Sequence, residues 1–148
     1  SSIDNFSEIH RILAQSQSAG YGRRGDQWFS PPGNFYASYV KKVKELTKNP
    51  IIPLLGQQLC NDLRSLSINS QFDSPNDINI DGQKVAGLIA EMEETEGGFA
   101  IIIGVGMNIE VAPFAQRPTC CLHDFNPSIT LEEIAQITDK SILKIINQ

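Results

Sequence analysis

The chain has no long hydrophobic run, few cysteines and no excess of positive charge. Its longest apolar stretch runs from Phe99 to Met107, nine residues including two glycines, whereas a transmembrane helix needs about 20. We therefore expect no membrane partner. Three cysteines in 148 residues, two of them adjacent, do not make a disulfide framework, and no secretory signal is visible. These absences predict a reducing, cytoplasmic setting.

The charge is acidic overall but unevenly spread along the chain. Twelve Lys and Arg against 17 Asp and Glu give a net charge of −5, which argues against a nucleic-acid partner. Residues 1–50 hold seven basic and four acidic groups, whereas residues 51–148 hold five basic and thirteen acidic groups. An anion-binding site is therefore expected near the N-terminal end.

Residue patterns predict strands first, then a helix, a meander of strands and a closing helix, an order typical of an α+β fold. Asp81-Gly82 between alternating apolar residues predicts a tight hairpin. The expected strands are Ile9–Ser16, Phe35–Val40, Val85–Met92, Phe99–Val105 and a short one over Met107–Val111. The expected helices are an amphipathic one of about 15 residues from Asn49-Pro50 to Leu66 and a closing one over Leu131–Ile146, with an irregularity and a Thr130–Glu133 capping box.

The most informative segment is residues 17–28, part of an expected ordered loop over residues 17–33 that we call the Gly-Arg loop. It contains a formal GxGxxG pattern, but the following Trp28-Phe29-Ser30-Pro31-Pro32 cannot open a helix, so we reject a dinucleotide-binding interpretation. Glycines still let backbone N–H groups approach an anion, and Arg23 and Arg24 add donors suited to phosphate or carboxylate. On composition alone, a ligand site and a solvated surface loop are about equally favoured.

Three further motifs strengthen the ligand-site interpretation. They are Asp73-Ser74-Pro75-Asn76-Asp77, Gln83-Lys84-Val85-Ala86-Gly87-Leu88 and Ile103-Gly104-Val105-Gly106-Met107-Asn108-Ile109. Together with the Gly-Arg loop, over about residues 9–111, they resemble the biotin–protein ligase catalytic domain of the biotin/lipoate ligase superfamily. The resemblance implies a mixed, largely antiparallel β-sheet flanked by helices, similar to the class II aminoacyl-tRNA synthetase core. We expect residues 1–148 to form one such domain, with no N-terminal DNA-binding domain and no C-terminal β-barrel.

The resemblance also implies roles for individual residues. The residues implied to bind biotin are Gln17, Gly20, Gly22, Arg23, Lys84, Gly87 and Leu88. Those implied to bind ATP or AMP are Arg23, Arg24, Gly25, Trp28, Asn76, Asp77, Lys84 and Asn108. Lys84 and Arg23 are the implied catalytic residues, and Asp77 the implied magnesium ligand.

The implied activity is two-step acyl transfer. Biotin is activated by ATP as biotinyl-5'-AMP and is then passed to a lysine of the biotin carboxyl carrier protein of acetyl-CoA carboxylase. ATP and Mg²⁺ would enter as a substrate complex, with no tightly bound cofactor. Because carboxylate and phosphate repel each other, the reaction needs cations such as Lys84 and Arg23.

Several positions depart from the family pattern. Asp73-Ser74 stands where Lys-Trp is usual, Tyr21 stands where an arginine is common, and Ser1–Asn5 is only loosely similar to a biotin-contacting Ser-Thr-Asn segment. Two alternatives therefore stay open: a lipoate or octanoate ligase or transferase on the same fold, and a catalytically degenerate biotin-binding module. Pairing of an exposed sheet edge with a carrier or with a second copy, as a homodimer, is also left open. Cys120-Cys121-Leu122-His123 is not favoured as a metal site, because adjacent cysteines rarely bind one zinc ion.

Overall fold

The computed structural model describes residues 9–147. Six strands form one sheet in the order β1-β2-β6-β5-β4-β3, and each neighbouring pair is antiparallel. The strands are β1 (Ile9–Ala14), β2 (Phe35–Val43), β3 (Gln71–Asp73), β4 (Asp77–Ile80), β5 (Gln83–Thr95) and β6 (Gly98–Met107). The helices are α1 (Ile51–Arg64) and α2 (Leu131–Ile146), with short 3-10 turns η2 (Arg23–Gly25) and η3 (Leu122–Asp124). The predicted α+β fold, an antiparallel sheet flanked by helices, is confirmed.

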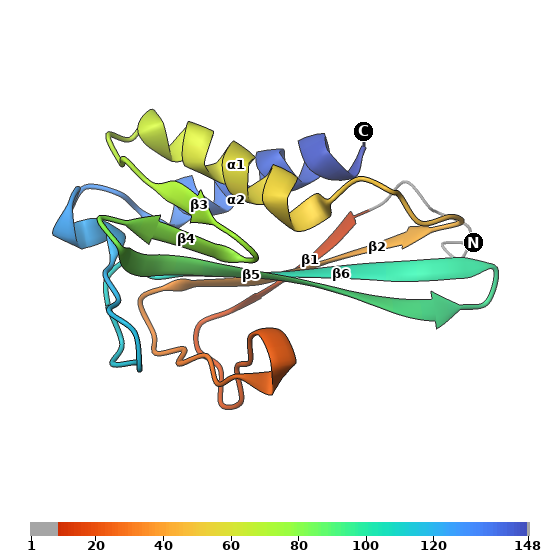
Figure 1. Ribbon diagram of the computed structural model, residues 1–148, viewed down its shortest axis with the longest axis horizontal. Helices are drawn as coiled ribbons and strands as arrows, with labels where there is room; N and C mark the ends of the chain where they lie inside the picture. Colours follow the sequence, from red (N-terminus) through yellow and green to blue (C-terminus); the bar gives the residue numbers. More distant parts are fainter. Residues whose placement is uncertain (1–8, 148) are drawn as a thin grey trace.

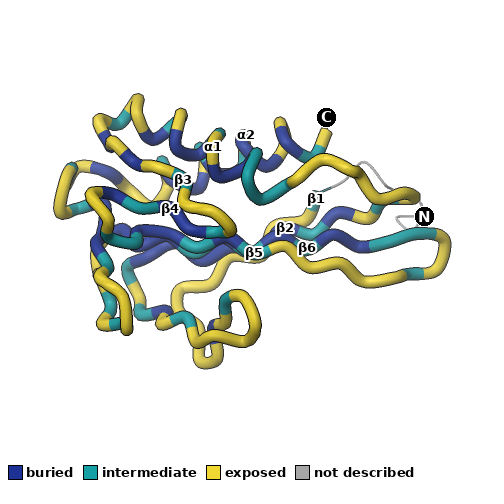
Figure 2. The backbone as a smooth tube through the Cα atoms, viewed as in Figure 1, coloured by how far each residue is buried: buried dark blue, intermediate teal, exposed yellow. Residues whose placement is uncertain are grey.

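The two helices cover one face of the sheet, and the Gly-Arg loop lies against the other (Figure 1). Leu55, Leu59 and Leu63 recur at four-residue spacing in α1 and are fully buried against the sheet. Alternate residues of β6, such as Ile103 and Val105, face them. The buried layer runs between helices and sheet (Figure 2), so the opposite sheet face remains available for a site.

The predicted hairpin at Asp81-Gly82 is confirmed and sets the start of β5. Asp81 has φ 50° and Gly82 has φ 79°, the left-handed pair that a two-residue turn between twisted strands requires. The turn places Lys84, the second residue of β5, opposite Asn79 of β4.

Three local predictions are corrected. β6 ends at Met107 and residues 108–111 form no strand, because the Asn34 side-chain oxygen accepts hydrogen bonds from the backbone N–H groups of Ile109, Glu110 and Val111. The closing helix α2 is continuous, so the expected irregularity is wrong, although its Thr130–Glu133 capping box is confirmed. α1 ends at Arg64, short of Leu66, and strand β3 was not predicted.

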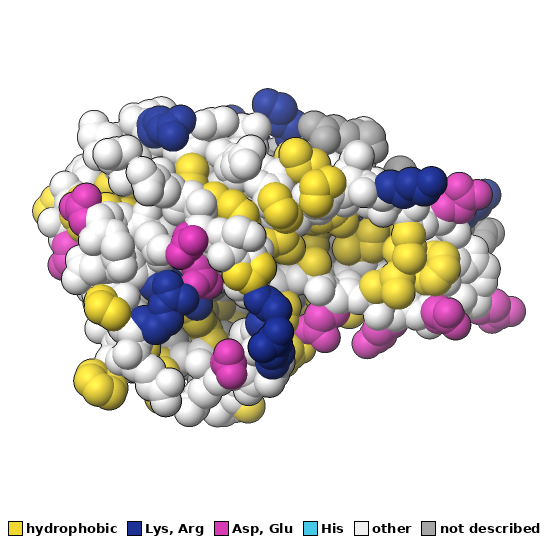
Figure 3. Space-filling model, viewed as in Figure 1, with side chains coloured by type: hydrophobic (Ala, Val, Ile, Leu, Met, Phe, Trp, Pro, Cys, Tyr) yellow, Lys and Arg dark blue, Asp and Glu magenta, His cyan; other side chains and the backbone are white. Residues whose placement is uncertain are grey.

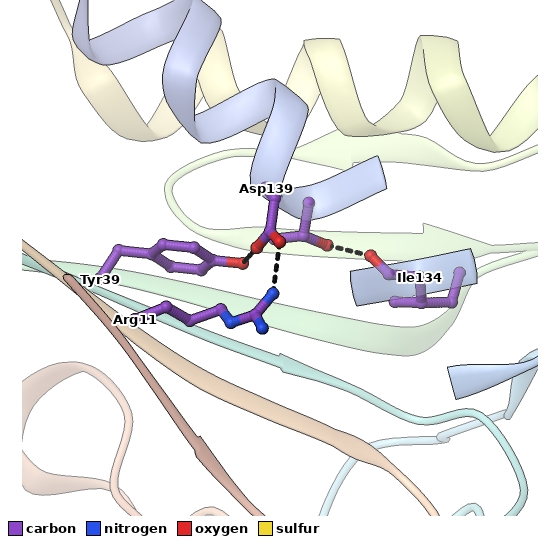
Figure 4. Close-up of polar contacts among 5 residues, drawn as sticks. Arg11, Tyr39, Ile134 and Asp139 are labelled. Atoms are coloured by element: carbon purple, nitrogen blue, oxygen red, sulfur yellow. Dashed lines mark hydrogen bonds and ion pairs between the residues drawn. The ribbon is translucent and has the colours of Figure 1, made fainter. Parts of the chain in front are cut away.

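The edge strand β1 and its neighbour β2 are tied to α2 by one carboxylate. Asp139 of α2 pairs with Arg11 of β1 and accepts a hydrogen bond of 2.5 Å from the Tyr39 hydroxyl of β2 (Figure 4). The edge of the sheet is thereby fixed to the helical layer. Among residues 9–147, neither helix has the length and apolar character needed to cross a bilayer.

Candidate functional site

A cleft of about 830 Å³ lies on the sheet face that the helices leave uncovered. Its walls are the Gly-Arg loop, the facing ends of β4 and β5, and the segment 113–119. Basic side chains gather around this region on the face shown in Figure 3. Segments far apart in the sequence therefore meet here, as the family resemblance implies.

The Gly-Arg loop is held in shape by its own backbone. The Trp28 N–H donates to the Gly20 carbonyl at 2.9 Å and the Gly22 N–H to the Asp26 carbonyl at 2.6 Å. A Cβ built at Gly20 would lie 2.6 Å from the Trp28 carbonyl oxygen, so only glycine fits there. Arg24, with φ 58°, turns the chain at the tip, and the cleft is lined by both loop arginines, Arg23 and Arg24.

Trp28 brings an aromatic ring down onto the sheet. A Cβ built at Gly106 would lie 2.7 Å from the indole Nε1, and one built at Gly87 would lie 3.2 Å from the indole Cζ3. These two glycines, on adjacent strands, form a flat floor that accepts the ring. The indole N–H is buried and has no hydrogen-bond partner within residues 9–147.

The charged centre of the cleft is a row of three side chains, which we call the charged row: Lys84, the buried carboxylate of Asp77, and Arg117. Lys84 Nζ lies 3.0 Å from one carboxylate oxygen of Asp77, and Arg117 Nη1 lies 2.5 Å from the other. Lys84 Nζ also lies 4.8 Å from the centre of the Trp28 ring, within cation–π range. The row therefore presents two cations and one anion to the cleft.

Backbone hydrogen bonds fix Lys84 from a third part of the chain. Its N–H donates to the Pro118 carbonyl at 2.9 Å, and its carbonyl accepts from the Cys120 N–H at 3.0 Å. Residues 118–120 thus run beside the start of β5 as a short parallel bridge. This bridge sets the position of Arg117 relative to Lys84.

Other predicted site residues have structural partners. Asn108 is buried, donates its side-chain amide to the Cys120 carbonyl at 3.1 Å and accepts from Asn34 at 3.3 Å. The Asn76 carbonyl accepts the Leu88 N–H at 2.9 Å, and the Leu88 side chain lies in the core. Asn76 shapes the wall through its backbone carbonyl, and Leu88 does so through its backbone N–H and its core-packed side chain.

The structure brings most of the predicted site residues to this one cleft. Those that line it are Gln17, Gly22, Arg23, Arg24, Trp28, Asn76, Asp77, Lys84, Gly87, Leu88 and Asn108. Gly20 and Gly25 shape the loop but do not line the cleft, and Ser1–Asn5 lies outside the described residues. Arg117 was missed, because it lies 40 residues from Asp77 in a segment without a motif.

Tyr21 and Asp73, two residues that depart from the family pattern, also make side-chain hydrogen bonds. The Tyr21 hydroxyl donates to Glu91 of β5 at 2.8 Å, and this hydrogen bond raises the pKa of Tyr21 above its ordinary value. Tyr21 therefore ties the Gly-Arg loop to the sheet. Asp73 accepts a hydrogen bond from Asn79 at 3.1 Å.

The predicted magnesium site on Asp77 does not fit this arrangement. Each of its two oxygens already pairs with a cation, and a divalent ion there would be repelled by Lys84 and Arg117. Within residues 9–147, no group of three or more His, Cys, Asp or Glu side chains is placed to hold a metal ion. His123 Nε2 instead contacts the Ile129 carbonyl oxygen at 2.7 Å.

Comparison with known proteins identifies relatives of this chain. A model of the biotin/lipoate A/B protein ligase family matches residues 6–108. The chain is 32% identical over 115 residues to the biotin–[acetyl-CoA-carboxylase] ligase of Paracoccus denitrificans, covering 70% of this chain and 46% of the relative. It is 34% identical over 115 residues to the bifunctional ligase/repressor BirA of Escherichia coli, covering 72% of this chain and 36% of that relative. The chain thus spans less than half the length of these curated relatives.

Solved structures share the fold. The biotin protein ligase from Aquifex aeolicus, in complex with biotin and ATP, superposes with a TM-score of 0.77 at 20% sequence identity. The match covers 93% of this chain and 60% of that one. At this level of identity the likeness concerns the fold.

Proposed function

Because the chain belongs to the biotin/lipoate A/B protein ligase family, we propose that it is an ATP-dependent biotin–protein ligase. The observation that carries this proposal is the single cleft in which the Gly-Arg loop, Lys84 and the Asn76-Asp77 pair meet. Curated relatives that bear the ligase name match over about 70% of the chain. A solved relative with biotin and ATP bound has the same fold.

In the first step, a carboxylate oxygen of biotin attacks the α-phosphorus of ATP. The bond between the α-phosphorus and the bridging oxygen breaks, pyrophosphate leaves and biotinyl-AMP forms. Both reactants are anions, so the cleft must offset their repulsion. Lys84 and Arg23 supply positive charge where negative charge builds up on the phosphoryl oxygens, and Arg24 adds a further cation at the loop tip.

In the second step, a lysine amine of an acceptor protein attacks the carbonyl carbon of biotinyl-AMP. AMP leaves with the bonding electrons, and the amine loses its proton as the amide forms. The proposed acceptor is the biotin carboxyl carrier protein of acetyl-CoA carboxylase, in line with the name of the relative from Paracoccus denitrificans. The chain supplies no covalent nucleophile and acts by holding the reactants in place.

The cleft residues also protect the mixed anhydride from water. The Gly-Arg loop lies over the open sheet face (Figure 1), and the Trp28 ring fills the floor at Gly87 and Gly106. Predicted contacts for the two substrates follow from the motifs: Gln17, Gly22 and Gly87 on the biotin side, and Arg24, Asn76 and Asn108 on the nucleotide side. Magnesium enters the proposal only with ATP, as the substrate complex.

The decisive experiment is to incubate the purified chain with biotin and MgATP and to look for biotinyl-AMP by mass spectrometry. Parallel reactions contain lipoate or octanoate, the acids used by the alternative activities. We expect an acyl-adenylate and pyrophosphate with biotin only. An adenylate of lipoate or octanoate alone would favour the second ligase class, and biotin binding without any adenylate would identify a biotin-binding module.

A further inference from the structure

Arg117 is the one cation of the charged row that no motif predicted. Its guanidinium pairs with an Asp77 carboxylate that is only 8% exposed, while the Arg117 side chain itself is 52% exposed. Lys84 pairs with the other oxygen of the same carboxylate and is 20% exposed. Asp77 is therefore a buried anion with two cation partners, one in the wall of the cleft and one at its rim.

Two partners for one buried carboxylate have an energetic consequence. A buried charge stripped of its only partner is strongly destabilising. If Asp77 were paired with Lys84 alone, any substrate anion that drew Lys84 away would leave the carboxylate unpaired. With Arg117 in place, Asp77 keeps a partner when Lys84 leaves.

The surroundings of Lys84 allow such a change of partner. Apart from Asp77, its ammonium group faces the neutral Trp28 ring at 4.8 Å. An ammonium group has three donors, so Lys84 can turn toward an anion in the cleft. The backbone beside Arg117 is fixed, because the adjoining Pro118 carbonyl accepts a hydrogen bond from the Lys84 N–H, and this keeps the Arg117 side chain within reach of Asp77.

We propose that Arg117 is a positioning residue that holds Asp77 and so releases Lys84 to bind the anionic groups of the substrates. This inference rests on the proposed function, in which Lys84 serves the carboxylate and the α-phosphate. Arg117 acts on the reaction through Asp77 and Lys84 rather than by touching the reacting atoms. Two residues after Arg117, the Thr119 hydroxyl donates to the Pro113 carbonyl at 2.8 Å and closes the segment.

The test is a double-mutant cycle between Arg117 and Asp77, with the dissociation constant for MgATP measured by titration calorimetry. Arg117→Ala is expected to weaken MgATP binding at least about 10-fold, because Asp77 then holds Lys84. In an Asp77→Asn background the same change should weaken binding less than about 3-fold, because Lys84 is already free. Arg117→Lys should stay close to wild type, since it returns a cation to Asp77.

Controls separate this role from a structural one. Arg64→Ala removes an exposed arginine of α1 that contacts Asn61, and it should leave MgATP binding unchanged. Thermal melting of each variant establishes that it is folded, and Arg117→Gln replaces Arg117→Ala if the latter does not fold. Equal weakening in both backgrounds would mean that Arg117 binds phosphate directly and would overturn the inference, as would unchanged binding in Arg117→Ala.

The inference and the proposed function fail in different ways. Coupling between Arg117 and Asp77 without any biotinyl-AMP would support the inference and contradict the ligase proposal. Biotinyl-AMP formation without coupling between Arg117 and Asp77 would support the ligase proposal and overturn the inference. A chain that binds neither MgATP nor biotin would overturn both.

Discussion

Lys84 is placed by three parts of the chain at once. The hairpin turn at Asp81-Gly82 positions it on β5, the backbone of residues 118–120 brackets it, and Asp77 holds its ammonium group. Its side chain is 20% exposed, which leaves it accessible from the cleft. A lysine whose backbone is fixed and whose ammonium group can reach the cleft is suited to bind transferring phosphoryl groups.

Replacing Lys84 should therefore abolish most of the first step. Lys84→Ala is expected to lower biotin-dependent pyrophosphate release about 100-fold or more, because one charged donor at the reacting phosphate is lost. The measurement is a pyrophosphate-release assay at saturating biotin and MgATP. Lys140→Ala, on the exposed side of α2, is the matched control and should retain full activity; a fully active Lys84→Ala would show that this lysine is misassigned.

At the residue scale, motifs predicted which side chains share the cleft but not what they contact. Trp28 was expected beside a nucleotide base, and its ring here lies on the glycine floor of β5 and β6. Asn108 was expected near the nucleotide, and its amide bonds to Asn34 and Cys120. Arg117 had no motif to mark it, since its importance depends only on folding beside Asp77.

At the element scale, the contact between α1 and β3 is unusually close. Gly56 of α1 faces the Phe72 ring of β3, and a Cβ built at Gly56 would lie 2.1 Å from Phe72 Cδ1. Alanine normally favours a helix over glycine by about 1 kcal/mol. Here the packing requires glycine, because the ring occupies the space of the methyl group.

Gly56→Ala should accordingly lower the free energy of unfolding by about 1–3 kcal/mol, the usual cost of overpacking. Urea denaturation measures the change. Gln57→Ala, at the exposed neighbouring position, is the control and should be neutral or slightly stabilising. The double variant Gly56→Ala/Phe72→Ala should cost less than the sum of its single changes, whereas a Gly56→Ala variant more stable than wild type would refute the packing argument.

The capping box of α2 gives a second prediction at this scale. The Thr130 hydroxyl accepts the Glu133 N–H at 3.1 Å, and the Glu133 carboxylate accepts the Thr130 N–H at 3.0 Å. Thr130→Ala should lower the free energy of unfolding by about 1 kcal/mol. Thr130→Ser keeps the hydroxyl and should restore most of the loss in the same denaturation experiment; an equal loss in both variants would rule out the cap as its source.

Elements with strong local signals were predictable, and elements fixed by distant contacts were not. The hairpin at Asp81-Gly82 and the cap at Thr130–Glu133 each depend on residues within four positions of one another, so both could be predicted from the sequence. The segment 108–111 has a strand-like sequence, but the Asn34 side chain, just before the neighbouring strand β2, accepts hydrogen bonds from its N–H groups. Strand β3 has only three residues and depends on pairing with β4 and on packing against α1.

At the scale of the whole molecule, buried acids determine how stability depends on pH. Burial, reinforced by the hydrogen bond to Asp139, raises the pKa of Tyr39 well above its ordinary value. Burial likewise raises the pKa of the Cys120 thiol to about 11. These groups keep their protons in the folded state and lose them in the unfolded chain, so the unfolded state binds fewer protons at alkaline pH.

The contribution of these two groups to stability should therefore be constant below about pH 8, and stability should fall as the pH rises through the ordinary thiol and phenol pKa values of about 8.5 and 10. The measurement is the urea midpoint at a series of pH values. Tyr39→Phe removes the phenol and should flatten the fall above about pH 9.5, while leaving the thiol contribution in place. A wild-type midpoint that stays constant up to about pH 10.5 would contradict the assignment.

The chain contains a single tryptophan, and Trp28 lies in the cleft against Lys84. The intrinsic fluorescence of the unlabelled protein therefore comes largely from one indole at the proposed reaction site. Indole emission responds to the charge and water around the ring, so movement of Lys84 or arrival of a ligand should change its intensity or wavelength. Each stage of the proposed reaction can then be followed optically in real time, with the protein as its own probe.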